Sequence, residues 1–212
     1  MSGKDEGSDG SNIGGFIFLL NNIPLYFKPE EEISVLRSPL LNVAATYILP
    51  LEQILSSRLN AAGFIRNIYV NFGPRGCCEL NPSTKPVTEL AKFAEQLRHL
   101  LQDGIIYNPE NGEVACRMFT NLSSLVSTLP ANCRKIGCMH GTGSLAQGPI
   151  MDFTNYIEAA SDDQTLVFVI GVVDPEIHSY IDDFVKVCDY DLVATYGLTK
   201  VISAVEIKVG LV

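Results

Sequence analysis

The apolar run "TLVFVIGVV" at residues 165–173 is the strongest constraint on the fold of this chain. The run is too short to cross a bilayer as a helix, and it has the length and β-branched content of a buried strand. Segments with helical periodicity lie on both sides of it and separate it from other short apolar segments. Strands that alternate with helices predict an α/β fold, with a parallel sheet covered by helices on both faces in the second half of the chain.

The expected elements follow one another along the whole chain. Strands are predicted at 14–22, 64–72, 76–80, 134–140, 166–173 and 190–196, and helices at 49–63, 85–104, 152–160, 176–188 and 199–208. The helix over 85–104 is the best defined, because Pro86 suits its first turn, an apolar stripe runs along one side and Gly104 ends it. A polar loop is expected at 107–113.

The size of the chain indicates one domain. Its 212 residues, 47% of them hydrophobic, suffice for one substantial core. Residues 1–12, "MSGKDEGSDGSN", are polar and acidic, so a flexible tail is expected before a single domain over 13–212. The tail lacks the basic start and apolar centre of a secretory signal, and no apolar run reaches eighteen residues. A soluble protein without membrane association is expected.

The six cysteines include the adjacent pair Cys77 and Cys78. A short strand would point these two side chains to opposite faces, which does not suit a disulfide framework, so a reducing compartment is expected. Cys133, Cys138 and His140 form a cluster without the second ligand pair or the spacing of a zinc knuckle. No metal site is predicted.

The formal net charge of −9 argues against a polyanionic partner, but the charge is unevenly distributed. Residues 58–135 contain nine of the fifteen Lys and Arg residues and only six of the 24 acidic residues. Within this stretch, Gly73-Pro74-Arg75-Gly76 has the composition of a tight turn that would direct Arg75 outward.

A basic strip follows this corner. Lys85, Thr88 and Lys92 recur at spacings of three and four, so they would share one helix face. The corner and the strip suit contacts with phosphate groups, but charged residues at turn tips and on solvated helix faces are also common without a ligand. The residues alone leave both interpretations open.

Four segments, taken together, resemble the Nep/Emg family of SPOUT-class pseudouridine methyltransferases. "RLNAAGFIRNIYVNFGPRGCCELNP" is similar to the family's "SPLNKAG…(S)RG…(I/V)EVNP", and "LPANCRKIGCMHGTG" to its "LPxxCRKVTLS". "PIMDFTNYIEAASDDQTLVFVIG" resembles "PVxxxxDYIEKLxDDExxxVFVG", and "YGLTKVISA" resembles "VGLSNYPLSAS" with one residue fewer. These segments cover most of residues 50–205 in the family's order.

The resemblance implies a homodimer with a SPOUT-like sheet and a C-terminal trefoil knot that holds S-adenosylmethionine. It implies methyl transfer to ring nitrogen 1 of a pseudouridine in small-subunit rRNA, together with pre-ribosomal assembly factors as partners. The nucleus and nucleolus would be the compartment, or the cytoplasm in an archaeal cell. The implied cofactor-binding residues are Ile170, Gly171, Gly197, Leu198, Thr199 and Ile202, with Gly197 and Leu198 opening a turn into the last helix. The implied RNA-binding residues are Arg75, Lys85, Thr88, Lys92 and Arg134.

The chain departs from the family pattern at the implied catalytic position. Where the family has "LLDSPLNKAG", this chain has "ILSSRLNAAG", so Ser56 replaces an aspartate, Arg58 a proline and Ala61 a lysine. Ser56 and Arg75 are the catalytic candidates, but a serine cannot accept a proton as an aspartate does. Two functions therefore stay open: a methyltransferase that acts mainly through proximity and orientation, or a dimeric assembly factor that binds RNA or protein without turnover.

Overall fold

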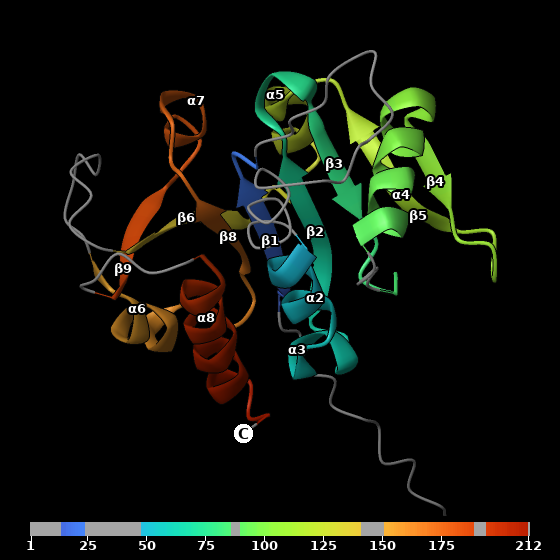
Figure 1. The fold of residues 1–212 in the computed structure, drawn as a ribbon. Coiled ribbons are helices and arrows are strands. Elements are labelled where there is room, and N and C mark those ends of the chain that lie inside the picture. The colour runs from blue at the N-terminus through green and yellow to red at the C-terminus, as the bar shows by residue number, and fades with distance from the viewer. Residues whose placement is uncertain (1–13, 24–47, 86–89, 141–150, 189–193, 212) are drawn as a thin grey trace, which may run out of the picture.

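The computed structural model describes residues 14–23, 48–85, 90–140, 151–188 and 194–211. Within these ranges, nine strands form one sheet in the order β4-β5-β3-β2-β1-β8-β6-β9-β7 (Figure 1). The tail predicted over 1–12 lies outside the described residues.

Six neighbouring strands of the sheet are parallel. In sheet order they are β2 (Ile65–Asn71), β1 (Phe16–Asn21), β8 (Thr165–Gly171), β6 (Cys133–His140), β9 (Asp183–Cys188) and β7 (Met151–Asp152). Every residue of β1 is buried, as are the first six of β8, which explains why the sequence of both strands is an unbroken apolar run. The predicted parallel sheet is confirmed.

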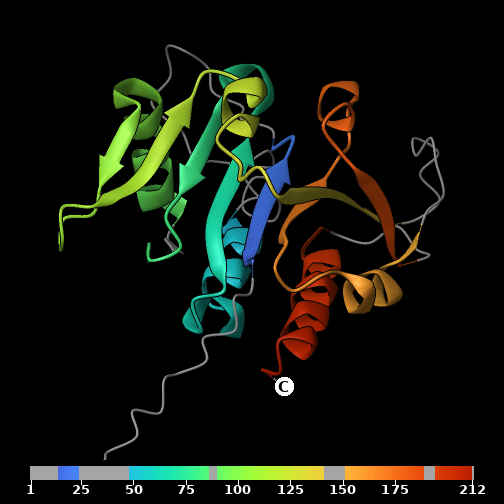
Figure 2. The ribbon, with the colours of Figure 1, turned by 180° about the vertical axis from the view of Figure 1, so that it is seen from behind.

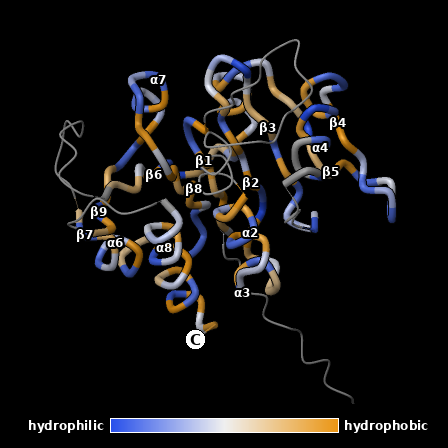
Figure 3. Tube along the Cα trace, in the orientation of Figure 1, coloured by the Kyte–Doolittle hydropathy of each residue, from blue (hydrophilic) through white to orange (hydrophobic). Residues whose placement is uncertain are grey.

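The other three strands form an antiparallel extension on the β2 side. They are β3 (Cys77–Leu80), β5 (Val114–Phe119) and β4 (Ile105–Tyr107). The 3₁₀ turn η2 (Gly73–Arg75) joins β2 to β3, as the corner composition predicts. The predicted polar loop connects β4 to β5, and it is hydrophilic in Figure 3. Sequence reasoning did not predict β4 and β5.

Helices cover both faces of the sheet, as predicted. One face carries α2 (Leu49–Leu55), α3 (Arg58–Ala61), α4 (Leu90–Asp103), α6 (Phe153–Ala159) and α8 (Ala194–Lys208), whose apolar residues share the larger core. The other face carries α5 (Leu122–Val126) and α7 (Pro175–His178) over a smaller core. Accordingly, α2 lies in front of the β1–β2 pair in Figure 1 and behind it in Figure 2.

The helix predicted over 49–63 is interrupted in the structure. Ser56 ends α2, and its hydroxyl donates to the Glu52 carbonyl oxygen at 2.6 Å. Ser57 then adopts an extended conformation and caps α3 by accepting from the Asn60 amide at 3.2 Å. Two adjacent serines, which favour helix ends, therefore divide the segment into two short helices.

Two predictions near the C-terminal end are wrong. The helix over 176–188 is the four-residue α7 followed by strand β9, because residues 183–188 pair with β6 in the sheet. The strand over 190–196 is contradicted at its end, where Ala194–Tyr196 form the first turn of α8. The connections 141–150 and 189–193, on which the path of the predicted knot depends, lie outside the described residues.

Candidate functional site

The carboxyl ends of β1, β2 and β8 meet at one edge of the sheet. Asn21 is paired with Gly171 across β1 and β8, and Asn71 is the last residue of β2. In open α/β sheets, ligands bind outside the carboxyl ends of the strands. The predicted cofactor-binding residues are therefore expected at this edge of the sheet, which we call the carboxyl edge.

Gly171 ends β8 in a conformation that only glycine adopts easily. Its φ is +116°, and a Cβ on it would lie 2.5 Å from the main-chain oxygen of Asn21. The close approach seen at this glycine is to the main chain of β1. The close approach to a ligand that the sequence predicts here stays a prediction. The adjacent Val172 is 61% exposed, so the main chain at 171–172 lies at the surface.

Helix α8 begins on the side of this carboxyl edge. At its other end, Lys208 donates to the Ala160 carbonyl oxygen at 2.7 Å and pairs with Asp162 at 3.0 Å, and Asp162 contacts Gly14 just before β1 begins. A helix of 15 residues is about 22 Å long, so α8 extends from the carboxyl ends of the strands to their amino ends.

The structure places four of the six cofactor candidates in α8. The predicted turn at Gly197 and Leu198 is wrong, because both residues lie inside the helix, where they are buried. Leu198 and Ile202 belong to the same core cluster as Ile170 of β8, on the face of the sheet that α8 covers. Thr199 is exposed, and its hydroxyl accepts from the Gln53 amide of α2 and donates to the Thr195 carbonyl oxygen.

Arg75 also lies at the carboxyl edge, on the corner after β2. The corner is held by the Phe72 amide donating to the Gly76 carbonyl oxygen at 2.9 Å and the Gly76 amide donating to the Gly73 carbonyl oxygen at 3.0 Å. Gly76 has a φ of +96°, and a Cβ there would lie 2.5 Å from the Phe119 carbonyl oxygen. Arg75 is exposed on this well-defined turn, as predicted.

Sequence reasoning missed two asparagines between these sites. Asn21 and Asn71 are among the three polar or charged side chains in the described residues that are fully buried. They lie between the Gly171 loop and the Arg75 corner and are hydrogen-bonded to each other. A signal was present in the sequence, because each asparagine directly follows an apolar strand segment, "FIFLL" or "IYV".

Ser56 and Arg75 lie far apart in the folded chain. The turn after α2 is tied to the segment after β3, because the Asn60 side-chain amide donates to the carbonyl oxygens of Leu55 and Pro82 at 2.8 and 2.9 Å. Arg75 lies at the opposite end of the β2–β3 hairpin. The two catalytic candidates are therefore not brought together in one chain.

A surface pocket of about 460 Å³ instead connects the Ser56 region with the basic strip. It is lined by Leu55, Asn60, Gly63, Ile65, Pro82, Ser83, Thr84 and Lys85. Lys85 is exposed and pairs with Glu110 at 2.6 Å. Lys92 is exposed on α4, whereas Thr88 lies outside the described residues.

Arg134 lies near the amino end of β6 and is already bound by a carboxylate. Its Nε and Nη2 both donate to Asp183 of β9, the second at 3.0 Å, and the Tyr156 hydroxyl donates to the same carboxylate at 2.7 Å. The bond from Arg134 holds the pKa of Asp183 below its ordinary value. Burial raises the pKa of Tyr156, and its bond to Asp183 raises it further. An RNA phosphate would have to compete with Asp183 for this guanidinium.

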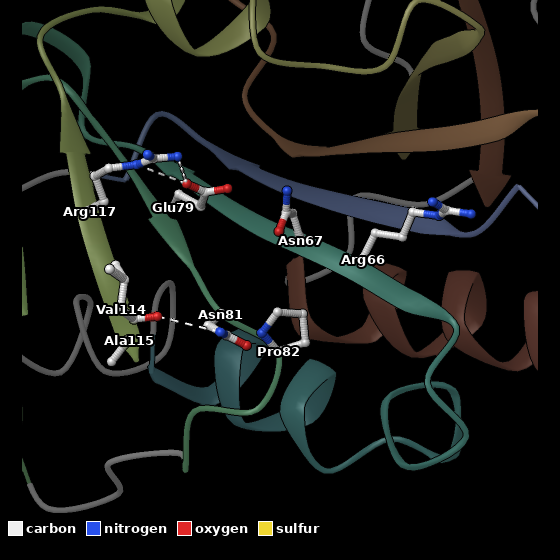
Figure 4. Close-up of a pocket in the computed structure, with 8 residues that line it drawn as sticks. All are labelled: Arg66, Asn67, Glu79, Asn81, Pro82, Val114, Ala115 and Arg117. Carbon is white, nitrogen blue, oxygen red and sulfur yellow. Dashed lines mark hydrogen bonds and ion pairs between the residues drawn. The ribbon is translucent and has the colours of Figure 1, made fainter. Parts of the chain in front are cut away.

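A second pocket, of about 270 Å³, opens over β2, β3 and β5 (Figure 4). It is lined by Arg66, Asn67, Glu79, Asn81, Pro82, Val114, Ala115 and Arg117. Arg117 donates from Nε to Glu79 at 3.1 Å, and Arg66 points away from this pair in Figure 4. The two guanidinium groups thus do not converge on one ligand position.

The cysteines behave as the sequence predicts. Cys77 and Cys78 belong to the two different core clusters, and the six cysteines, all within the described ranges, form no disulfide. Cys133 and Cys138 also lie on opposite faces of the sheet, so they cannot bind one metal ion together. Among the described helices, none has both the length and the apolar character that crossing a membrane requires.

Comparison with known proteins identifies the family. Residues 48–206 match the model of the EMG1/NEP1 methyltransferase family. The ribosomal RNA small subunit methyltransferase mra1 of Schizosaccharomyces pombe is 25% identical over 163 residues, which are 75% of this chain and 43% of that protein. The chain thus spans less than half the length of this curated relative.

A crystal structure of Archaeoglobus fulgidus Nep1 bound to S-adenosylhomocysteine shares the fold. Its TM-score is 0.63 at 12% sequence identity, over 93% of this chain and 99% of that one. The predicted α/β class and SPOUT-like sheet are confirmed by this likeness. Since the family model matches three quarters of the residues, the chain belongs to the EMG1/NEP1 methyltransferase family.

Proposed function

We propose that this protein is an S-adenosylmethionine-dependent methyltransferase that modifies ring nitrogen 1 of a pseudouridine in small-subunit rRNA. The observation that carries the proposal is the family match over residues 48–206, which includes every site residue predicted from the sequence. A role in small-subunit assembly belongs to the same proposal. So do a homodimer, pre-ribosomal partners and a nucleolar location, or a cytoplasmic one in an archaeal cell.

The carboxyl edge fits the proposed cofactor. An adenine ring would lie over the part of the core that contains the buried Ile170, Leu198 and Ile202. The partly exposed main chain at Gly171 would supply hydrogen bonds, whereas the Val172 carbonyl oxygen already accepts from Asn21. Gly197 and Thr199 would contact the rest of the cofactor from the first turns of α8. The sulfonium centre of S-adenosylmethionine supplies an activated methyl group, so the protein mainly has to orient the acceptor base.

The proposed RNA contacts come from three parts of the chain: the Arg75 corner, the segment after β3 and the start of β6. Arg75 at the carboxyl edge, and Lys85 with Thr88 and Lys92 after β3, would bind phosphates and hold the loop in place while one unstacked base is recognised. Lys85 carries Glu110 beside it and Arg134 carries Asp183, so RNA binding would have to displace or bridge these carboxylates. We therefore expect moderate affinity with a strong dependence on salt.

A specific observation favours a second candidate function, a dimeric assembly factor without turnover. Ser56 replaces the family's aspartate, and its hydroxyl is committed to the Glu52 carbonyl oxygen. The pseudouridine nitrogen loses a proton during methylation, and a serine is a poor acceptor at neutral pH. This candidate keeps the binding of RNA or protein and gives up the reaction.

Calorimetry with S-adenosylmethionine tests the first candidate. Binding is expected, and no binding at millimolar cofactor would eliminate the methyltransferase. A methylation assay on a hairpin that contains pseudouridine then separates the two candidates, because only the enzyme releases S-adenosylhomocysteine.

The Arg75→Ala variant tests the RNA assignment. It should bind the hairpin more weakly, with a salt dependence of the affinity reduced by about one unit of slope, as expected for one lost phosphate contact. Arg98→Ala on α4 removes the same charge from an exposed position outside the proposed contacts. If both variants bind as the parent does at moderate salt, Arg75 does not contact RNA.

A further inference from the structure

Two asparagines are buried where the proposed cofactor loop and the Arg75 corner come closest in the sheet. Asn21 is 1% exposed at the end of β1, and Asn71 is 3% exposed at the end of β2. β1 lies between β8 and β2 in the sheet (Figure 1). A buried amide is costly unless its donors and acceptors are satisfied, so the contacts of these two side chains define what they do.

The two side chains form a continuous chain of hydrogen bonds across three strands. The Gly73 amide donates to Asn71 Oδ1 at 2.9 Å, Asn71 Nδ2 donates to Asn21 Oδ1 at 2.7 Å, and Asn21 Nδ2 donates to the Val172 carbonyl oxygen. The Cys77 thiol donates to Asn71 Oδ1 as well, at 3.3 Å. Burial raises the pKa of this thiol to about 12, so it keeps its proton at neutral pH.

The donor-to-acceptor direction of this series of hydrogen bonds is fixed by the backbone groups at its two ends. A backbone amide can only donate and a backbone carbonyl can only accept, so Gly73 and Val172 dictate which way both side-chain amides face. Turning the Asn21 amide would break two hydrogen bonds in a buried place, and turning the Asn71 amide would break three. The Asn21–Asn71 pair therefore acts as one rigid connection and not as two independent side chains.

Each end of the connection reaches a segment with a proposed ligand. Gly73 opens the turn that carries Arg75, and Val172 follows Gly171, whose Cβ position is blocked by the Asn21 main chain. The Ile23 amide also donates to the Asn71 carbonyl oxygen at 2.9 Å, which ties the exit of β1 to the exit of β2.

We propose that Asn21 and Asn71 are positioning residues that couple the cofactor loop at Gly171 and Val172 to the RNA-binding corner at Arg75. The coupling rests on the proposed function, because it needs both ligands. A ligand that orders one loop also fixes the amide beside it, and the rigid pair transmits this order to the other loop. The second ligand then has less conformational freedom to remove, and the effect is reciprocal between the two ligands.

The test measures the affinity of a pseudouridine-containing hairpin with and without saturating S-adenosylhomocysteine. In the parent protein, the cofactor product should tighten hairpin binding about fivefold, the lower end of common coupling strengths. In Asn21→Leu and Asn71→Leu, this ratio should fall to about one. Asn71→Asp keeps the acceptor for Gly73 but loses the donor to Asn21, so it replaces Asn71→Leu if that variant does not fold.

Thr165→Val is the matched control for general destabilisation. Thr165 is 2% exposed at the opposite edge of the sheet, where its hydroxyl donates to the Gly14 carbonyl oxygen at 2.7 Å. The control loses one buried hydrogen bond and should keep the fivefold ratio. A ratio that survives in both asparagine variants, or that also disappears in Thr165→Val, overturns the coupling role.

The outcome also separates this proposal from the proposed function. A parent protein that binds both ligands with no coupling contradicts the asparagine connection alone. A parent that binds neither ligand contradicts the proposed function and the connection together.

Discussion

Single residues at the strand ends determine the shape of the carboxyl edge. Gly171, Ile170 and Leu198 are predicted as site residues from the sequence, because a glycine ends an apolar strand segment there and the neighbouring segments resemble those of the family. The connection between Asn21 and Asn71 could not, because the two residues are 50 positions apart and their hydrogen bonds depend on β1 and β2 being neighbours. Local patterns contain no information about such a pairing.

Replacing Gly171 by alanine should destabilise the protein more than the same change at an open glycine. At Gly171, a Cβ meets the Asn21 main-chain oxygen at 2.5 Å and the φ is +116°, so steric overlap adds to backbone strain. We expect a loss of about 3 kcal/mol in the free energy of unfolding, against about 1 kcal/mol for Gly104→Ala. Gly104 also has a positive φ, but nothing lies within 4 Å of its Cβ position. Urea unfolding of both variants measures the difference, and equal losses would contradict the close contact.

Asp183→Asn should lower stability at neutral pH, because Asp183 accepts hydrogen bonds from Arg134 and Tyr156. The cost is expected to be about 1–3 kcal/mol. The folded-state pKa of Asp183 lies below its unfolded value, so its contribution is complete above about pH 4 and is lost as the pH falls through the folded pKa. The difference between variant and parent should therefore shrink toward pH 2 in urea titrations. Asp182→Asn is the control, since Asp182 is more exposed and its amide replacement can still accept from Lys135.

At the scale of elements, the sequence predicts best where packing and local preference agree. The strand β2 and the helix α4 lie within their predicted ranges, and β8 begins one residue before its predicted range, because an apolar run or a clear helical stripe matches their final environment. The helix prediction over 176–188 was wrong because Ile177, Ile181 and Val185 recur every four residues, as apolar residues do in a helix. Pairing with β6 overrides this periodicity after residue 182, and that partner lies more than 40 residues away in sequence.

Helix α8 should depend on its buried face for stability. Leu198 is fully buried in the larger core, whereas Ile207 on the same helix is 66% exposed. Leu198→Ala should cost about 2–5 kcal/mol, and Ile207→Ala less than about 0.5 kcal/mol. Because Leu198 also underlies the proposed cofactor site, its variant should bind S-adenosylmethionine more weakly at temperatures where it is folded. Denaturant unfolding and calorimetry on both variants provide the comparison, and similar losses at the two positions would refute this packing.

For the whole molecule, the class of architecture could be predicted from the sequence, but the order of the strands could not. Alternating strands and helices predict a parallel sheet, and the family resemblance supplies the SPOUT-like arrangement. The antiparallel extension of β3, β5 and β4 was missed in part, because Ile105–Tyr107 is too short to stand out as a strand before its partner is known. Opposite faces for Cys77 and Cys78 could be predicted, since side chains alternate along any strand.

The thiols should be poorly reactive in the folded protein. Burial raises the pKa of Cys77 to about 12 and that of Cys116 to about 11, and it also raises the pKa of Cys138. Few of these three thiols are therefore ionised at pH 8. Brief iodoacetamide treatment at pH 8 should therefore leave these three cysteines unmodified in the native state and modify all six in urea. Peptide mass spectrometry locates the labels. Rapid native labelling of Cys138 would show that β6 is not packed as described.

The central position of β1 has a consequence for synthesis on the ribosome. β1 pairs with β2 within about 50 residues, but its other neighbour is β8, and Asn21 and Val172 are 151 positions apart. When only the first half of the nascent chain has emerged from the ribosome, the apolar strand β1 has one edge without a hydrogen-bonding partner. Such an edge is prone to pairing with other chains. Protection of that edge has to await translation of residues 165–171, so slow elongation before this point should favour aggregation.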